Sequence, residues 1–205
     1  MTHMRLYAVV GFVGLVGTLA ASERVTAQGQ TGRPVKTVRL WVDRAGPGTS
    51  DLAEALQRVE DVAEVSIVGT TMLPIPRGAS RSPASPTRFF EAIVLGTYKQ
   101  TKIAGKGAQI VIEQPGGEVE ESGEIVNYVD PSFPVLDKGG QYILYLKWNQ
   151  YTGAFSIIYG PEGAFQVEGS RLRSPGHTPI TLAQTGRSVE VFRGALRAAA
   201  AARPR

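Results

Sequence analysis

Residues 141–160, QYILYLKWNQYTGAFSIIYG, decide the fold that this sequence predicts. Aliphatic and aromatic side chains dominate the first part, residues 149–153 (NQYTG) supply a turn, and the following run predicts a returning strand. Side chains alternate across a strand, so one face carries Ile143, Tyr145 and Lys147. The other face, which we expect to be the core, carries Tyr142, Leu144, Leu146 and Trp148.

Several other short, β-rich runs accompany this hairpin, each bounded by Gly, Pro, Asn or Asp. They are VSIVGTTML (65–73), TRFFEAIVLGTYK (87–99), AQIVIEQ (108–114), GEIVNYV (123–129) and AFQVEGS (164–170). Gly96, inside the longest run, predicts a bulge or a sharp bend. The spacing predicts a mainly β fold, either a small barrel resembling the oligonucleotide/oligosaccharide-binding (OB) type or a β-sandwich.

Two segments predict helices on either side of the strands. Residues 44–65 contain a turn followed by a helical pattern, which Thr49 or Ser50 can cap, with an apolar face of Leu52, Leu56 and Val59. Residues 185–205 contain an alanine run after Ser188, a second potential cap, and predict a C-terminal helix.

The N-terminus has the layout of a secretory signal. Arg5 is followed by an uncharged apolar run at 6–21, and Val25-Thr26-Ala27 offers a cleavage site; an uncleaved anchor helix is the alternative. We therefore expect an exported protein, periplasmic or secreted. The expected organisation is a signal peptide (1–27), a loose leader with a possible short strand (28–47), a β-barrel-like domain with a mobile loop at 73–86 (48–170), and a basic helical tail (171–205).

Composition excludes several kinds of chemistry. The chain has no cysteine, which excludes disulfides, thiol catalysis and cysteine-type zinc sites. Its formal net charge of +4 is unevenly distributed. Residues 171–205 hold seven arginines against one glutamate, a net charge of +6, whereas residues 28–170 hold 13 basic and 16 acidic residues, a net charge of −3.

Residues 113–124, EQPGGEVEESGE, raise the question of a cation site. A calcium site needs six to eight converging oxygen ligands at set spacings. This stretch contains no Asp or Asn, and turn residues surround its carboxylates, which are Glu118, Glu120, Glu121 and Glu124. It therefore predicts a solvated connection between two strands.

No catalytic, cofactor-binding or metal-ligating residues are predicted. After signal cleavage the chain contains one histidine, His177, and neither a GxSxG nucleophile motif nor an HExxH zinc motif. A Ser-His-Asp arrangement remains open with one histidine, and the sequence does not single out a pair of carboxylates for sugar hydrolysis.

Three pieces of the chain together resemble a diffuse group of exported bacterial β-domains of unknown function, found alone or beside matrixin-type metalloprotease domains. The pieces are PTRFFEAIVLGTYK, IVIEQPGGE and FPVLDKGGQYILYLKW…YGPEGAFQV, and the matching positions are Thr87, Phe89, Gly116, Gly117, Gly140, Tyr142, Gly160, Gly163 and Phe165. The chain departs from the group at LGTYKQTK, where a Leu-Lys-Gly turn is absent. The resemblance implies a fold and no activity.

The main functional hypothesis is an exported, non-enzymatic binding or structural module for a protein, glycan or envelope component, with no specific nucleic-acid partner and no membrane attachment after cleavage. One alternative is an envelope hydrolase with a carboxylate-based site; another is polyanion binding through the arginine-rich tail. Tyr145, Tyr151 and Tyr159 are aromatic residues that could stack on a ligand.

Export can be tested directly. In a bacterial envelope fraction, N-terminal sequencing of the mature protein should begin at Gln28, because cleavage is expected after Ala27. A membrane-bound form that retains Met1 would contradict cleavage.

Overall fold

The structure is a computed structural model, and it describes residues 35–39, 51–71, 86–133 and 135–202. The predicted signal peptide and all of the predicted mobile loop except Pro86 lie outside these residues. The described part is mainly β, with one helix before the long strands and helices at the C-terminal end, as the sequence predicted. None of the described helices is long and apolar enough to cross a membrane.

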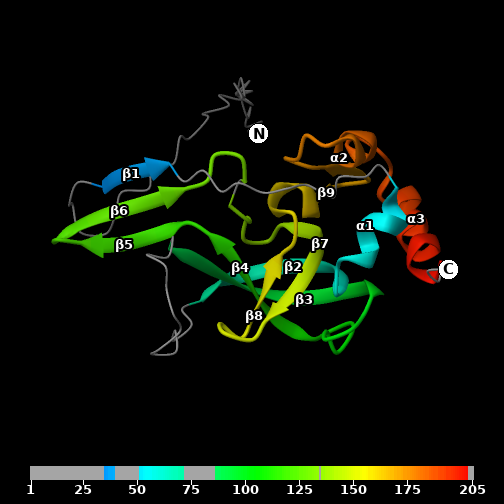
Figure 1. Cartoon of the computed structure of the whole chain (residues 1–205), viewed down its shortest axis with the longest axis horizontal. Helices are drawn as coiled ribbons and strands as arrows, with labels where there is room; N and C mark the ends of the chain where they lie inside the picture. Colours follow the sequence, from blue (N-terminus) through cyan, green and yellow to red (C-terminus); the bar gives the residue numbers. More distant parts are fainter. Residues whose placement is uncertain (1–34, 40–50, 72–85, 134, 203–205) are drawn as a thin grey trace, which may run out of the picture. The chain divides into compact units, whose positions relative to one another are not determined.

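Figure 1 shows the elements in chain order. They are β1 (Val35–Arg39), α1 (Leu52–Gln57), β2 (Asp61–Thr71), β3 (Thr87–Lys99), β4 (Gln109–Pro115), β5 (Gly117–Glu121), β6 (Glu124–Val129), β7 (Gln141–Asn149), β8 (Ala154–Ile157), the 3₁₀ helix η1 (Gly160–Gly163), β9 (Ala164–Glu168), β10 (Arg171–Arg173), α2 (Pro179–Gln184) and α3 (Val189–Ala201). β1, β6 and β5 form a small sheet, and the remaining strands form a larger one.

Five strands of the larger sheet close into a barrel. β2 pairs with β3, β3 with β4, and β4 runs parallel to β8, which pairs back onto β7; β7 in turn pairs with β2. This closure decides between the two predicted architectures in favour of the barrel. Taken in chain order, the five strands follow the order 1-2-3-5-4 around it, which is the connectivity of an OB-like barrel.

The barrel interior contains the face of β7 that the sequence assigned to the core. Tyr142, Leu144 and Leu146 are buried there. The fourth residue of that face, Trp148, is 37% exposed, so its assignment to the core was wrong. Trp148 lies at the end of the hairpin, where its ring packs edge-on against Phe155 with the ring centroids 5.0 Å apart. At this point β7 extends beyond the core, so part of the indole ring of Trp148 is exposed to solvent.

The opposite face of β7 is also buried, which alternation alone did not predict. Tyr145 packs on Phe165 of β9 at 5.5 Å between ring centroids, and Phe165 packs on Phe192 of α3 at 4.8 Å. This second core lies between the outside of the barrel and helices α1 and α3, which Figure 1 shows beside each other. β7 is therefore a central strand with apolar neighbours on both sides, and its near-continuous apolar run has this physical cause.

Helix α1 is shorter than its sequence pattern suggested. Its N-cap is Asp51, whose Oδ1 accepts a hydrogen bond from the Ala53 N–H at 2.7 Å. The helix ends at Gln57, and Asp61 already belongs to β2. The Asp61 carboxylate accepts the backbone N–H of Thr101 at 2.7 Å, so strand pairing and this buried contact override the helical pattern.

An ion pair holds α3 against the barrel. Arg193 donates through Nε to Glu64 of β2 at 3.0 Å, and the hydroxyl of Tyr98 donates to the same carboxylate at 2.8 Å. The bonds to Glu64 raise the pKa of Arg193, which keeps it cationic. Ser188 is the N-cap of α3 by position, but its side chain makes no capping bond in the described structure. Tertiary contacts therefore fix this helix.

A substitution pair in β7 tests the two-sided register. Leu146→Ala removes a side chain that is fully buried in the barrel and should lower the free energy of unfolding by about 2–5 kcal/mol, measured by urea denaturation. Lys147→Ala, at an exposed neighbouring position, is the control and should change it by less than about 0.5 kcal/mol. If Leu146→Ala left stability unchanged and Lys147→Ala were strongly destabilising, the assignment of these two residues to the buried and exposed faces of β7 would be wrong.

Candidate functional site

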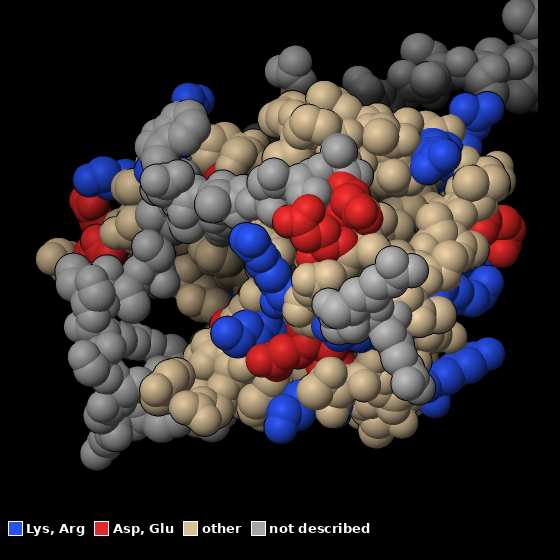
Figure 2. Space-filling model, turned by 45° about the vertical axis from the view of Figure 1, so that its right-hand side comes forward, with Lys and Arg blue, Asp and Glu red and all other residues tan. Residues whose placement is uncertain are grey.

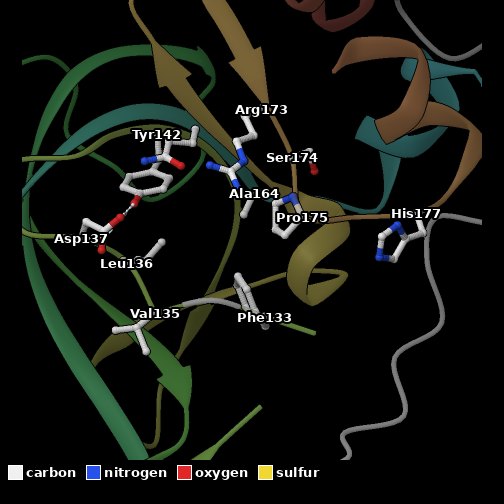
Figure 3. A pocket seen from close by; sticks show the side chains of 11 residues that line it. Phe133, Val135, Leu136, Asp137, Tyr142, Ala164, Arg173, Ser174, Pro175 and His177 are labelled. Carbon is white, nitrogen blue, oxygen red and sulfur yellow. Dashed lines mark hydrogen bonds between the residues drawn. The ribbon is translucent and has the colours of Figure 1, made fainter. Parts of the chain in front are cut away.

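Three neighbouring strands place one side chain each in a row. Tyr142 of β7 lies opposite Gln166 of β9, and Gln166 lies opposite Arg173 of β10. Residues directly opposite in antiparallel strands share a face of the sheet. The row therefore continues the inner face of the barrel onto β9 and β10, as Figure 3 shows for Tyr142 and Arg173.

The segment between β6 and β7 forms a wall across from this row. Gln114 is buried on β4, and its amide donates to the carbonyl of Phe133 at 3.1 Å and accepts the N–H of Leu136 at 3.3 Å. These bonds draw the segment onto the barrel. The hydroxyl of Tyr142 accepts the N–H of Asp137 at 3.0 Å, and burial raises the pKa of Tyr142, so the phenol stays neutral.

A buried carboxylate fixes a third wall, the loop between β10 and α2. Glu162 of η1 accepts the backbone N–H of His177 at 2.6 Å and the hydroxyls of Thr178 and Thr181 at 2.6 and 2.7 Å. Burial pushes its pKa up, but the hydrogen bonds from Thr178, His177 and Thr181 together outweigh burial, and the pKa of Glu162 lies below its usual value. No cation among the described residues pairs with Glu162, so hydrogen-bond dipoles keep the carboxylate ionised.

Gly176 permits this close approach. A Cβ at this position would lie 2.4 Å from Oε2 of Glu162, far inside contact distance. Any larger residue here would therefore have to displace the Glu162 carboxylate from the donors that hold it.

The three walls enclose a cavity of about 510 Å³ (Figure 3). This volume falls in the range of pockets that hold small molecules, roughly 300–1,000 Å³. The apolar lining comes from Phe133, Val135, Leu136, Ala164 and Pro175, and the polar lining from Asp137, Tyr142, Gln166, Arg173, Ser174 and His177. Several of the apolar residues also belong to the barrel core, so the floor of the cavity is preformed.

Asp137, Ser174 and His177 line the same cavity but form no catalytic triad. The hydroxyl of Ser174 accepts the N–H of Gly176 at 3.1 Å and donates to the carbonyl of Pro161 at 3.4 Å. Within the described residues no hydrogen bond joins the His177 imidazole to Ser174 or Asp137, and its ring stands apart from both in Figure 3. The nucleophile–base contact of a hydrolase is therefore not assembled.

A second, smaller cavity of about 240 Å³ lies beside the β7–β8 turn. Its carboxylate, Glu113, accepts hydrogen bonds from Asn149 at 2.9 Å, from Thr152 at 2.7 Å and from Ser156. These bonds fasten the turn to β4. Glu113, singled out only as the start of the acidic stretch, thus acts in the fold rather than in a cation site.

The acidic stretch forms a hairpin rather than a loop. β5 and β6 pair antiparallel around Ser122 and Gly123, whose φ angles are 53° and 83°. The carboxylates of the stretch that follow its glycine pair are all exposed: Glu118, Glu120, Glu121 and Glu124. Tyr128 donates to Glu121 at 2.6 Å. No group of three or more histidine and carboxylate side chains in the described part of the chain is placed to hold a metal ion.

Of the three tyrosines that could stack on a ligand, Tyr151 alone is largely exposed, at 66%. Tyr145 is buried in the second core, and Tyr159, with a φ of 64°, extends its hydroxyl to 3.4 Å from the carbonyl of Ala55. The tyrosine that does line the large cavity is Tyr142, which the sequence assigned to the core.

The arginines of the C-terminal segment that the structure describes are engaged with other groups of the protein. Each of the five in the described residues has a partner: Arg171 the Gly186 carbonyl, Arg173 Glu168, Arg187 Gln184, Arg193 Glu64, and Arg197 the ring of Tyr98. Figure 2 shows basic and acidic side chains interspersed on one face. The five described arginines are therefore tied to separate partners and do not form a continuous basic track among themselves.

No protein-family model matches the chain, and no curated protein matches it in sequence. A fold of this kind carries many unrelated functions, so the cavity itself must carry the functional inference.

Replacing Glu162 tests how the cavity wall is held. Glu162→Gln should lower the free energy of unfolding at pH 7 by about 1–3 kcal/mol, because an amide nitrogen faces donors that the carboxylate satisfied. The wild-type contribution is present above the unfolded pKa of about 4.3 and is lost as the pH falls through the lower folded pKa. Urea denaturation from pH 7 to 2 should therefore show the difference between wild type and variant shrinking in acid.

Glu124→Gln is the control for this experiment. Glu124 is exposed on the β5–β6 hairpin, and its replacement should change stability by less than about 0.5 kcal/mol. A Glu162→Gln protein as stable as wild type at pH 7 would mean that the loop is held by other contacts.

Proposed function

We propose that the protein is an exported binding module, periplasmic or secreted, whose ligand site is the 510 Å³ cavity beside the barrel. The observation that carries this proposal is the composition of the cavity. Its floor is apolar and belongs to the rigid core, whereas its rim carries a few polar groups from separate elements. Ligand sites in proteins have this construction, with apolar walls for affinity and few polar groups for orientation.

The contents of the cavities favour binding over hydrolysis. Sugar hydrolysis by the common mechanisms needs two carboxylates flanking one bond. Among the described residues, Asp137 is the one carboxylate lining the large cavity, and Glu113 is the one lining the cavity at the β7–β8 turn. Glu113 is moreover occupied by three side-chain hydrogen bonds.

The arginine-rich C-terminal segment supports packing better than polyanion binding. Neutralising a polyanion takes several cations along one track. Arg193 is instead committed to the buried carboxylate of Glu64, and Arg197 lies over the ring of Tyr98 at 5.7 Å from its centroid. Both arginines attach α3 to the barrel.

Export of this module rests on the N-terminal signal pattern. The resemblance to exported bacterial β-domains is consistent with it and suggests a role in the cell envelope or outside the cell. A partner there would be a protein, a glycan or another envelope component, reached after the signal segment has been removed.

A fragment screen tests the cavity as the ligand site. The purified mature protein, labelled with ¹⁵N, would be titrated with a library of small uncharged and charged organic fragments, and amide shifts would be recorded by NMR. We expect the largest shifts to gather at Phe133, Leu136, Tyr142, Ala164 and Arg173. Shifts gathered instead at the β7–β8 turn would move the site, and an absence of saturable shifts would overturn the proposal.

The same preparation separates binding from serine hydrolysis. Treatment with a fluorophosphonate probe, which labels activated serines, should leave Ser174 unmodified because its hydroxyl is used in the loop. Labelling of Ser174 that His177→Ala abolishes would identify a hydrolase.

A further inference from the structure

The rim of the large cavity carries one cation and one anion, on different elements. Arg173 enters from β10, whereas Asp137 enters from the segment that precedes β7 (Figure 3). Within the described structure the two side chains form no ion pair with each other; Arg173 pairs with Glu168 at 3.2 Å. The two charges therefore remain separate, with the apolar floor exposed to the same cavity.

Both charged groups can engage a ligand at small cost. The Arg173–Glu168 pair is exposed, with 69% and 50% of the side chains accessible, and such pairs contribute little to stability. A guanidinium also presents several donors in a plane and can bind two carboxylates at once. Asp137 accepts the hydroxyl of Tyr142 at 3.4 Å, a long contact that leaves lone pairs for a better donor.

The row of side chains on β7, β9 and β10 provides polar groups that can orient a ligand along the cavity. Gln166 lies between Tyr142 and Arg173 and offers an amide that both donates and accepts. Such a group matches a peptide bond. The floor below, formed by Phe133, Leu136 and Ala164, accepts apolar side chains.

We infer that the cavity binds short apolar peptides with free ends, the carboxylate at Arg173 and the ammonium at Asp137; this inference rests on the function proposed above. A ligand with one charge engages only one of the two charged rim groups. A single amino acid carries both charges on one carbon and lacks the peptide bond that the amide of Gln166 matches. A dipeptide separates its charges and places a peptide bond between them, opposite Gln166.

Three matched peptides test the inference by NMR titration of the mature protein. The probes are Phe-Leu, N-acetyl-Phe-Leu, which lacks the ammonium, and Phe-Leu amide, which lacks the carboxylate. Phe-Leu should shift the cavity amides, and each capped peptide should bind roughly two- to fivefold more weakly, the scale of one exposed ion pair. Capped peptides that bind as tightly as Phe-Leu, or free phenylalanine that binds as tightly, would overturn the inference.

Two variants assign the ends of the peptide. Arg173→Gln should abolish the preference for Phe-Leu over its amide and keep the preference over the N-acetyl form; Asp137→Asn should do the reverse. Arg171→Gln is the matched control, because Arg171 lies on the same strand outside the cavity lining, and both preferences should persist. Glu168→Gln removes the competitor of the ligand carboxylate and should strengthen Phe-Leu binding. Preferences that are unchanged in Arg173→Gln and Asp137→Asn would overturn the assignment.

The binding site and its charge recognition fail under different outcomes. If fragments bind in the cavity and the three peptides bind there equally, the charge recognition is wrong and the binding site stands. If neither fragments nor peptides shift the cavity amides, both the inference and the proposed function are wrong.

Discussion

The outer edge of β7 is shared between two strands, and this sharing shapes the rest of the molecule. Residues 142–144 pair with β9, and residues 146–149 pair with β8. The β8 part closes the barrel, because β8 also pairs with β4. The β9 part carries the inner face beyond the barrel onto β10. One edge of β7 thus pairs with β9 along its first part and with β8 along its second, and both the closed barrel and the cavity beside it follow from this division.

Between β8 and β9 the chain leaves the edge of β7 and then returns to it, and η1 forms this connection. It brings Glu162 under the loop that follows β10, where backbone and hydroxyl donors surround the carboxylate. A buried charge without a counter-ion costs a great deal of free energy unless dipoles solvate it. Here the hydrogen-bond dipoles stabilise the carboxylate strongly enough that the pKa of Glu162 lies below its usual value. The connection between β8 and β9 therefore also fixes the loop after β10, which forms one wall of the cavity.

An OB-like barrel does not settle what this protein binds. Barrels of this kind commonly bind ligands on the face of their second and third strands. Those strands here are β3 and β4, and the turn near them is fastened by Glu113. The cavity of about 510 Å³ lies elsewhere, beside strands added outside the barrel. The functional evidence accordingly lies in that cavity rather than in the fold.

The sequence by itself determined the fold class and most of the longer elements. Alternation and turn residues predicted the β7–β8 hairpin, the mainly β class and the small barrel as one of two options, and a capped alanine-rich run predicted α3. Gly96 predicted a bulge or bend in its strand. In β3 the neighbouring Leu95 is an extra residue, because Gly96 pairs with Glu64 and Val94 pairs with Val65. These features are local, since they depend on neighbouring residues and on steric preferences of the backbone.

Only the tertiary structure decided which strands pair, and with them the site. Barrel closure, the burial of Tyr145, the exposure of Trp148 and the conversion of Asp61 from helix to strand all depend on partners far along the chain. Tyr142, Gln166 and Arg173 share no spacing that marks them as a group; they meet because two registers align them. Register is set by packing between distant strands, and a shift of one residue would turn each side chain to the other face. The candidate site therefore could not be found from the sequence.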